Sequence, residues 1–235
     1  MKRLQTVAVS CFLLSQPTYA ADISVLIEGT KDHPALLLIE GAFTSAEESN
    51  DKGKFAEIAA AQKNGAIVFL DGQGGSLMTG TWLGREIRVL GFSTAVGENV
   101  QCVSACAIAW LGGRERFMAP HALVGFHSAT KWPWSRREID PYGNRIISLY
   151  LDDMGFKDRN AASYLTAAAP SSMTWVNADK LGRYGIEVND LNLSHERWSW
   201  IRSMRPLLHE QQRIKPLNTT EKLLIKWMDQ GKPRV

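Results

Sequence analysis

The stretch AIVFLDGQGGS, residues 66–76, decides the fold class of this chain. Its first five residues, 66–70, form an apolar run without a polar face, which is typical of a strand buried on both sides in a parallel sheet. A loop over residues 71–75 ends in the double glycine Gly74-Gly75, and residues 77–90 then show the apolar spacing of an amphipathic helix. A strand, a glycine-rich loop and a helix in this order predict a crossover unit of a parallel sheet.

The same alternation continues on both sides of this stretch. It predicts a largely parallel α/β sheet whose other strands lie at residues 23–27, 35–39, 93–96, 116–118 and 122–126. Further helices are expected at 47–63 and 104–111, with a loop leading to Cys102. After His127 this strand–helix alternation ends. A loop or insertion is expected over 128–143, followed by helices at 146–154, 159–169 and 177–184.

The two ends of the chain differ from this central part. Lys2 and Arg3, an apolar run from Val7 to Leu14, and a small-x-small ending at Ala20 predict a cleaved signal peptide over residues 1–20. We therefore expect a periplasmic or secreted protein, with one α/β domain over 21–189 and an extension over 190–235. The extension contains an apolar stripe at 223–228 that is expected to dock on the domain or on a partner, within a helix at 219–228.

Composition excludes several classes of protein. The chain has 235 residues, 45% of them hydrophobic and 22% charged, which argues against a disordered chain or a coiled coil. A formal net charge of +3 without a basic stripe argues against nucleic-acid binding. The five histidines are scattered, so we expect neither a metal site nor a cofactor, and no later segment is apolar for long enough to span a membrane.

Cys102 and Cys106 are the two cysteines that remain after the expected cleavage. An oxidising compartment favours their pairing, provided that the backbone between them turns into a helix. The alternative is two small buried thiols. A disulfide here would bracket Ser104 and stiffen its turn.

Three features, together with their order and spacing along the chain, could carry chemistry. Ser104 lies where a loop becomes a helix, His127 follows the strand at 122–126, and Gly74-Gly75 lies between a strand and a helix. In this order and spacing they supply a nucleophile, a base and backbone donors, which acyl transfer requires. Each also has a structural interpretation: a helix-capping serine, a packed histidine and a simple turn.

As a set, these motifs resemble the Clp protease proteolytic subunit and, more narrowly, periplasmic Clp-protease-like proteins of bacteria. The residues that carry the resemblance are IVFL at 67–70, GGS at 74–76, CVSACA at 102–107, LGG at 111–113 and GFH at 125–127. The resemblance covers about residues 22–188. It implies a crotonase-like spiral of ββα units, Ser104 as nucleophile, His127 as base, and an oxyanion hole formed by the N–H groups of Gly75 and Ala105.

The sequence departs from this family where the aspartate of the catalytic triad is expected. Counting back from Tyr184-Gly185-Ile186 reaches Met173, beside Ser171 and Ser172, and no carboxylate is there. The nearby carboxylates that could substitute through space are Asp152, Asp153 and Asp179. The sequence does not distinguish among them.

Three functional hypotheses follow. The first is an exported serine hydrolase, a peptidase with a Ser104–His127 dyad that acts on peptide or protein substrates. Assembly into a homo-oligomer is compatible with this hypothesis. The second is a non-catalytic module of the same fold that binds a peptide or protein partner. The third, a crotonase-type enzyme acting on a thioester, is disfavoured because coenzyme A thioesters are scarce outside the cytoplasm. Retention of the serine and histidine favours the first hypothesis, and the missing aspartate favours the second.

Overall fold

The protein has an α/β fold in which helices cover a curled, mostly parallel sheet. The structure is a computed structural model and describes residues 21–45, 51–131 and 137–191. The elements in chain order are β1 (Asp22–Ile27), β2 (Ala35–Phe43), α1 (Asp51–Ala60), β3 (Ala66–Gly75), α2 (Leu77–Val89), β4 (Ser93–Val96), β5 (Gln101–Val103), α3 (Ala105–Leu111), β6 (Arg116–Met118), β7 (Leu123–Phe126), α4 (Pro141–Asp153), α5 (Asn160–Leu165), β8 (Thr174–Val176), α6 (Ala178–Gly182) and β9 (Asn189–Asp190).

The sheet divides along β3. The strand order is β8-β7-β5-β3-β4-β6-β9, and β2 pairs with β3 and β1 outside this path. The first part of β3 pairs with β4 over residues 67–69, whereas Gly72 near its end pairs with Cys102 of β5. Only β1–β2 and β7–β8 are antiparallel among the described pairs. The fork therefore gives β5 and β7 a separate branch of the sheet.

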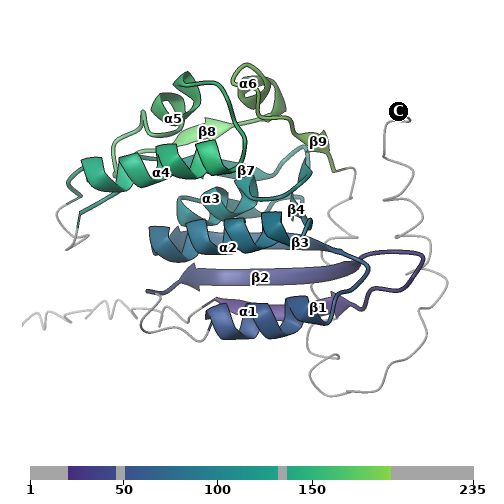
Figure 1. The fold of residues 1–235 in the computed structure, drawn as a ribbon. Coiled ribbons are helices and arrows are strands. Elements are labelled where there is room, and N and C mark those ends of the chain that lie inside the picture. The colour runs from purple at the N-terminus through teal and green to yellow at the C-terminus, as the bar shows by residue number, and fades with distance from the viewer. Residues whose placement is uncertain (1–20, 46–50, 132–136, 192–235) are drawn as a thin grey trace, which may run out of the picture.

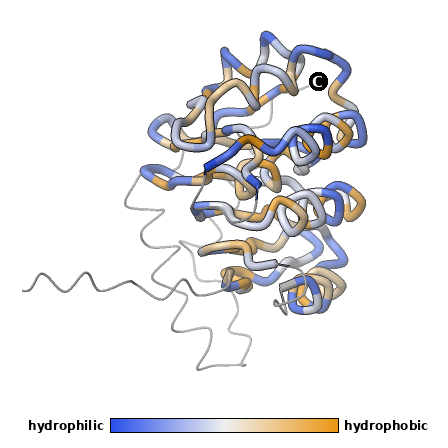
Figure 2. The backbone as a smooth tube through the Cα atoms, turned by 90° about the vertical axis from the view of Figure 1, so that its left-hand side faces the viewer, coloured by the Kyte–Doolittle hydropathy of each residue, from blue (hydrophilic) through white to orange (hydrophobic). Residues whose placement is uncertain are grey.

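The layers are stacked on one another (Figure 1). α1 covers β1 and β2, α2 and α3 lie on the other side of these strands, and α4 lies beyond α2, with α5, β8 and α6 farthest from α1. Hydrophobic residues run through the stacked layers, while hydrophilic residues gather on the outer turns (Figure 2). Residues 66 and 68–70 of β3 are buried, as a strand with helices on both faces requires.

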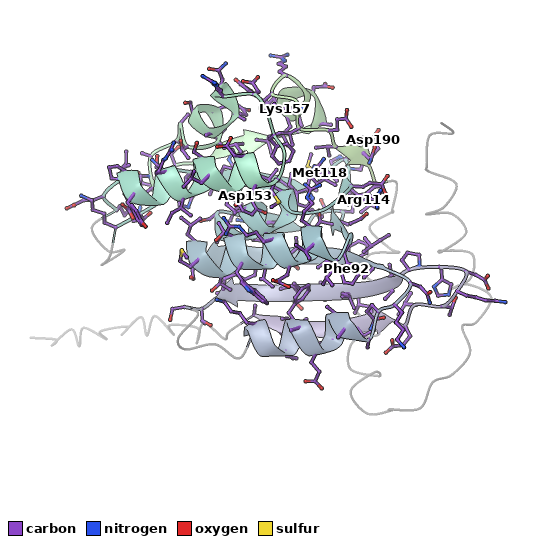
Figure 3. The ribbon with its side chains drawn as sticks, viewed as in Figure 1. Phe92, Arg114, Met118, Asp153, Lys157 and Asp190 are labelled. Carbon is purple, nitrogen blue, oxygen red and sulfur yellow. A yellow bond between two sulfur atoms is a disulfide. The ribbon has the colours of Figure 1, made fainter. Side chains whose placement is uncertain are left out.

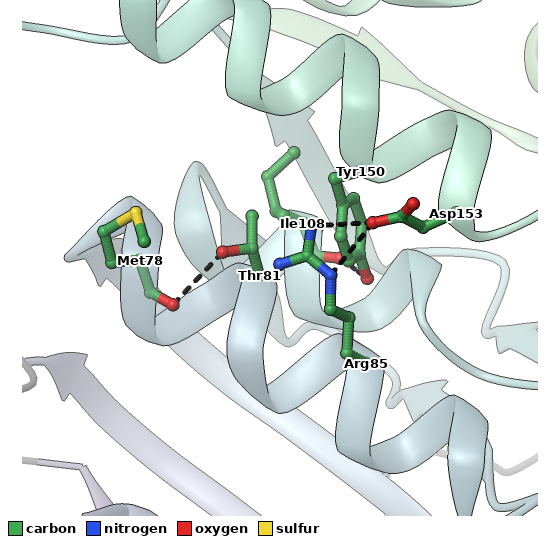
Figure 4. A network of polar contacts seen from close by, with 6 residues as sticks. All are labelled: Met78, Thr81, Arg85, Ile108, Tyr150 and Asp153. Atoms are coloured by element: carbon green, nitrogen blue, oxygen red, sulfur yellow. Dashed lines mark hydrogen bonds and ion pairs between the residues drawn. The ribbon is translucent and has the colours of Figure 1, made fainter.

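Tyr150 ties α4 to the helix that follows Ser104. Its hydroxyl donates a hydrogen bond of 2.9 Å to the carbonyl oxygen of Ile108 in α3 (Figure 4). The Tyr150 side chain is fully buried, and this burial raises its pKa well above the ordinary value, so that the hydroxyl keeps its proton. On the exposed side of the same contact, Arg85 of α2 donates to Asp153 of α4 at 2.8 Å and 3.0 Å.

The sequence-based prediction of an α/β class with a mostly parallel sheet is confirmed, but individual boundaries differ. The expected loop at 71–75 is the end of β3, because β2 continues beside it as far as Phe43. The expected loop before Cys102 contains β5, and β8 and β9 were not predicted. β9 is held by pairing of Asp190 with Met118 of β6, which lie close together in Figure 3.

The helices begin and end differently from the prediction as well. α4 begins at Pro141 rather than at 146, because Asp140 caps it and proline suits the first helical position. α1 ends at Ala60 rather than at 63, and α5 and α6 are shorter than the ranges predicted for them. The expected signal peptide at 1–20 and the helix at 219–228 lie outside the described residues.

Candidate active site

Three neighbouring strands end at the same edge of the sheet. β7, β5 and β3 are adjacent and parallel, so their carboxyl ends meet. β3 ends at Gly75, β5 is followed by Ser104, and β7 is followed by His127. Ligands of open α/β sheets bind at this edge. The topology thus brings together the residues that the sequence singled out.

Ser104 has an unusual backbone conformation. Its φ is 57° and its ψ is −126°, which residues other than glycine rarely adopt. The conformation is held from both sides, because the Ser104 N–H donates to the Gly125 carbonyl at 2.9 Å and its carbonyl accepts from Ile108 at 3.0 Å. Although Ser104 occupies the N-cap position of α3, its hydroxyl makes no capping bond. The hydroxyl is thus left free for another role.

Cys102 and Cys106 form a disulfide around this turn. Their Cα atoms lie 5.2 Å apart, with Cys102 in β5 and Cys106 in the first turn of α3. Both side chains are fully buried. The bridge therefore links the strand before Ser104 directly to the helix after it.

Gly74 is the glycine that approaches the Ser104 turn. Its φ is +87°, and a Cβ at this position would lie 2.6 Å from the Val103 carbonyl oxygen, 2.7 Å from the Ala105 nitrogen and 2.8 Å from the Ser104 Cβ. Atoms this close to a Cβ exclude any side chain. The sequence pointed to the pair Gly74-Gly75, and the structure assigns the close approach to its first member.

A cavity of about 470 Å³ lies at the carboxyl edge. Ser104 and His127 line it, together with Gly75 and Ala105, whose N–H groups the resemblance implies as the oxyanion hole. The Ala105 N–H belongs to the first turn of α3 and has no acceptor within the helix. The remaining wall is largely apolar and includes Leu77, Ile108, Phe126, Ile146, Ile147 and Leu165.

His127 is oriented by a backbone group. Its Nδ1 donates to the carbonyl oxygen of Ser128 at 2.6 Å, which leaves Nε2 as the unprotonated nitrogen of the neutral ring. Within the described part of the chain, no carboxylate forms an ion pair with His127 and no hydrogen bond joins its ring to Ser104. For a Ser104–His127 dyad we expect the two side chains to approach to about 2.6–3.2 Å, or somewhat looser without substrate, and this stays a prediction.

Met173 lies where the sequence count placed the aspartate. It directly precedes β8, and its side chain lies against Gly125 of β7, where a Cβ would be 2.5 Å from the Met173 Cγ. Met173 and His127 also line a second, shallower hollow that includes Arg137, Ser171 and Ser172.

The three substitute carboxylates do not line either hollow. Asp153 is bound to Arg85, Asp152 is exposed on α4, and Asp179 lies in the first turn of α6. Among the described residues, the carboxylate that lines the cavity is Asp140, which the sequence did not single out. Its Oδ1 accepts a capping bond of 3.0 Å from the Tyr142 N–H. The Asp-Pro pair at 140–141 was the available signal, because it is typical of a helix start.

Residues 21–45, 51–131 and 137–191 contain neither a cluster of metal ligands nor a candidate membrane span. No group of three or more metal-ligating side chains gathers there. No helix among these residues combines the length and the apolar character that crossing a bilayer needs. The tryptophans at 132 and 134 lie outside the described residues.

No protein-family model matches the sequence, and no curated protein sequence matches it significantly. Solved structures do match. A mutant of ClpP1 from Listeria monocytogenes has a TM-score of 0.49 and 16% identity, covering 67% of this chain and 92% of that one. The ClpP protease catalytic domain from Plasmodium falciparum has a TM-score of 0.48 and 14% identity, covering 66% and 84%. The 1510-N membrane-bound stomatin-specific protease, a mutant in complex with a substrate peptide, has a TM-score of 0.49 and 15% identity, covering 82% and 95%.

Proposed function

We propose that the protein is an exported serine peptidase with Ser104 as nucleophile and His127 as general base, acting on peptide or protein substrates without a cofactor. One observation carries the proposal. Ser104 is held in a backbone conformation that costs on the order of 1–3 kcal/mol for a residue other than glycine, and its hydroxyl is not used as a helix cap. Such strain is typical of functional sites, and the cavity that Ser104 lines is shared with His127.

The chemistry follows from the placement of these groups. Nε2 of His127 takes the proton of Ser104 as Oγ attacks the carbonyl carbon of the substrate. The N–H groups of Gly75 and Ala105 donate to the oxygen that becomes negative. His127 then gives the proton to the leaving amine as the peptide bond breaks. The acyl group is now bound to Ser104. His127 takes a proton from a water molecule as the water attacks the acyl carbon, and it returns a proton to Ser104 as the acid leaves.

A second function is a non-catalytic module that binds a peptide or protein partner in the same cavity. It is favoured by Met173, which lines the second hollow together with His127, and by the lack of a hydrogen bond between Ser104 and His127. In this case Ser104 would not be reactive.

Reaction with a fluorophosphonate probe distinguishes the two functions. The mature protein is treated with the probe and digested, and the modified residue is identified by mass spectrometry. A single adduct on Ser104 is expected, because only an activated serine reacts. Ser172 is the internal reference, since it is exposed and lines the second hollow beside His127. Adducts on both serines, or on neither, would contradict the peptidase function.

Export is proposed from residues 1–20 and is consistent with a disulfide between Cys102 and Cys106. Exported protein should begin at Ala21. After alkylation without reductant, its intact mass should show no modified thiol. Reduction under denaturing conditions before alkylation should give two modified thiols. A protein that still begins at Met1 in the cytoplasm, with Cys102 and Cys106 both alkylated, would refute export.

A further inference from the structure

One peptide bond connects His127 to a side chain on α4. The carbonyl oxygen of Ser128 accepts the 2.6 Å hydrogen bond from His127 Nδ1. The N–H of Ala129, at the other end of the same peptide unit, donates to Oδ1 of Asn144 at 2.7 Å. In a trans peptide the C=O and N–H groups point in opposite directions, so His127 and Asn144 lie at its two ends.

The groups around this peptide are all hydrogen-bonded. Ser128 is 2% exposed, its N–H donates to Ala168 at 2.8 Å, and its Oγ donates to the Thr166 carbonyl at 2.7 Å. The carbonyl of Ala129 accepts from the Asp140 N–H at 2.7 Å. The peptide is therefore fixed by α4 and by the end of α5, and it cannot rotate without breaking buried bonds.

The assignment of the Asn144 amide follows from this contact. A backbone N–H needs an acceptor, and only the oxygen of the amide can accept. Donation from Ala129 to that oxygen also polarises the peptide, which makes the Ser128 carbonyl a stronger acceptor for His127.

We propose that the Ser128–Ala129 peptide unit takes the place of the orienting carboxylate, and that Asn144 is its positioning residue. This inference rests on the proposed function. The carbonyl holds His127 in the Nδ1–H tautomer, so that Nε2 is free to accept a proton from Ser104. A carbonyl dipole stabilises the imidazolium less than a full negative charge would, so the site orients its base without an acid.

Three variants test the role of Asn144. Asn144→Ala removes the acceptor, Asn144→Asp keeps an acceptor and adds a negative charge, and Asn160→Ala is a matched control on the exposed start of α5. The first readout is the second-order rate of fluorophosphonate labelling as a function of pH. The second is the ¹⁵N spectrum of the His127 ring at a pH where the ring is neutral, which reports the tautomer whether or not the protein is labelled.

Asn144→Ala is expected to lower the labelling rate about 10- to 100-fold, the size of effect seen when groups that orient metal-bound histidines are removed. Asn144→Asp should label at close to the wild-type rate at high pH. The acidic limb of its labelling-rate profile should move to higher pH by about 0.5 unit, because the nearby negative charge favours the protonated His127 ring. Asp140 and Arg137 are the charged residues lining the two hollows around His127, and they are unchanged in all three variants.

Two results would overturn the inference. One is a folded Asn144→Ala variant that labels as fast as wild type and Asn160→Ala. The other is an Nε2–H tautomer of His127 in the wild-type protein. If wild type is not labelled at all, the peptidase function fails, and the ring spectrum still decides whether the peptide orients His127.

Discussion

Ser104→Ala and His127→Ala are each expected to lose fluorophosphonate labelling by about 10⁴-fold or more relative to wild type. The first variant lacks the oxygen that attacks, and the second lacks the base that activates it. Thermal unfolding should change little, because both residues lie at the ends of elements rather than in the core. Ser172→Ala, which removes an exposed serine beside His127, should label like wild type. Labelling kinetics and thermal melts on the same samples provide the measurement.

Equal labelling of wild type and Ser104→Ala would exclude Ser104 as the nucleophile. The cavity would then be that of a binding module, as in the second function above. Loss of labelling accompanied by a large fall in thermal stability would instead show that the alanine had damaged the fold.

Gly74→Ala is expected to lower the free energy of unfolding by about 3 kcal/mol or more. A Cβ at 74 meets the backbone of Val103 and Ala105 at 2.6–2.7 Å, and backbone around a buried disulfide cannot move aside cheaply. The positive φ adds about 1–2 kcal/mol. Urea unfolding monitored by circular dichroism measures the difference.

Gly155→Ala is the matched control for this variant. Gly155 has a φ of +82°, close to the +87° of Gly74, but a Cβ there meets nothing within 4 Å. Its cost should be the backbone contribution alone, about 1–2 kcal/mol. If both variants are destabilised equally, the close approach of Gly74 to the Ser104 turn has no energetic weight.

The class of the fold could be predicted because its central strands have no polar face. Residues 66–70 need burial on both sides, and that need implies crossover helices. β5, β8 and β9 were not predicted, because two or three residues rarely show a period, although β6 is equally short and was predicted. They become strands only because neighbouring strands offer them hydrogen bonds. Those neighbours are distant in the sequence, so a local pattern does not reveal the pairing.

The candidate site shows the same division. The order and spacing of their motifs pointed to Ser104 and His127 as one site, but the strand before Ser104 was not predicted. The structure brings them together because β5 and β7 are parallel neighbours that end at one edge of the sheet. Asn144 could not be connected to His127, because the link passes through a backbone N–H and depends on how α4 packs. An asparagine within a helix carries no local signal for such a contact.

The strained backbone of Ser104 has a consequence for how this position would drift under selection. At φ 57° a glycine would be more stable than a serine, and a residue that capped α3 in a relaxed conformation would also be favoured. A population of variants selected only for stability should therefore replace Ser104. A population selected for turnover should keep it, because the proposed reaction needs the serine hydroxyl. The residue found at position 104 after selection would thus show whether the protein had been selected for catalysis or only for stability.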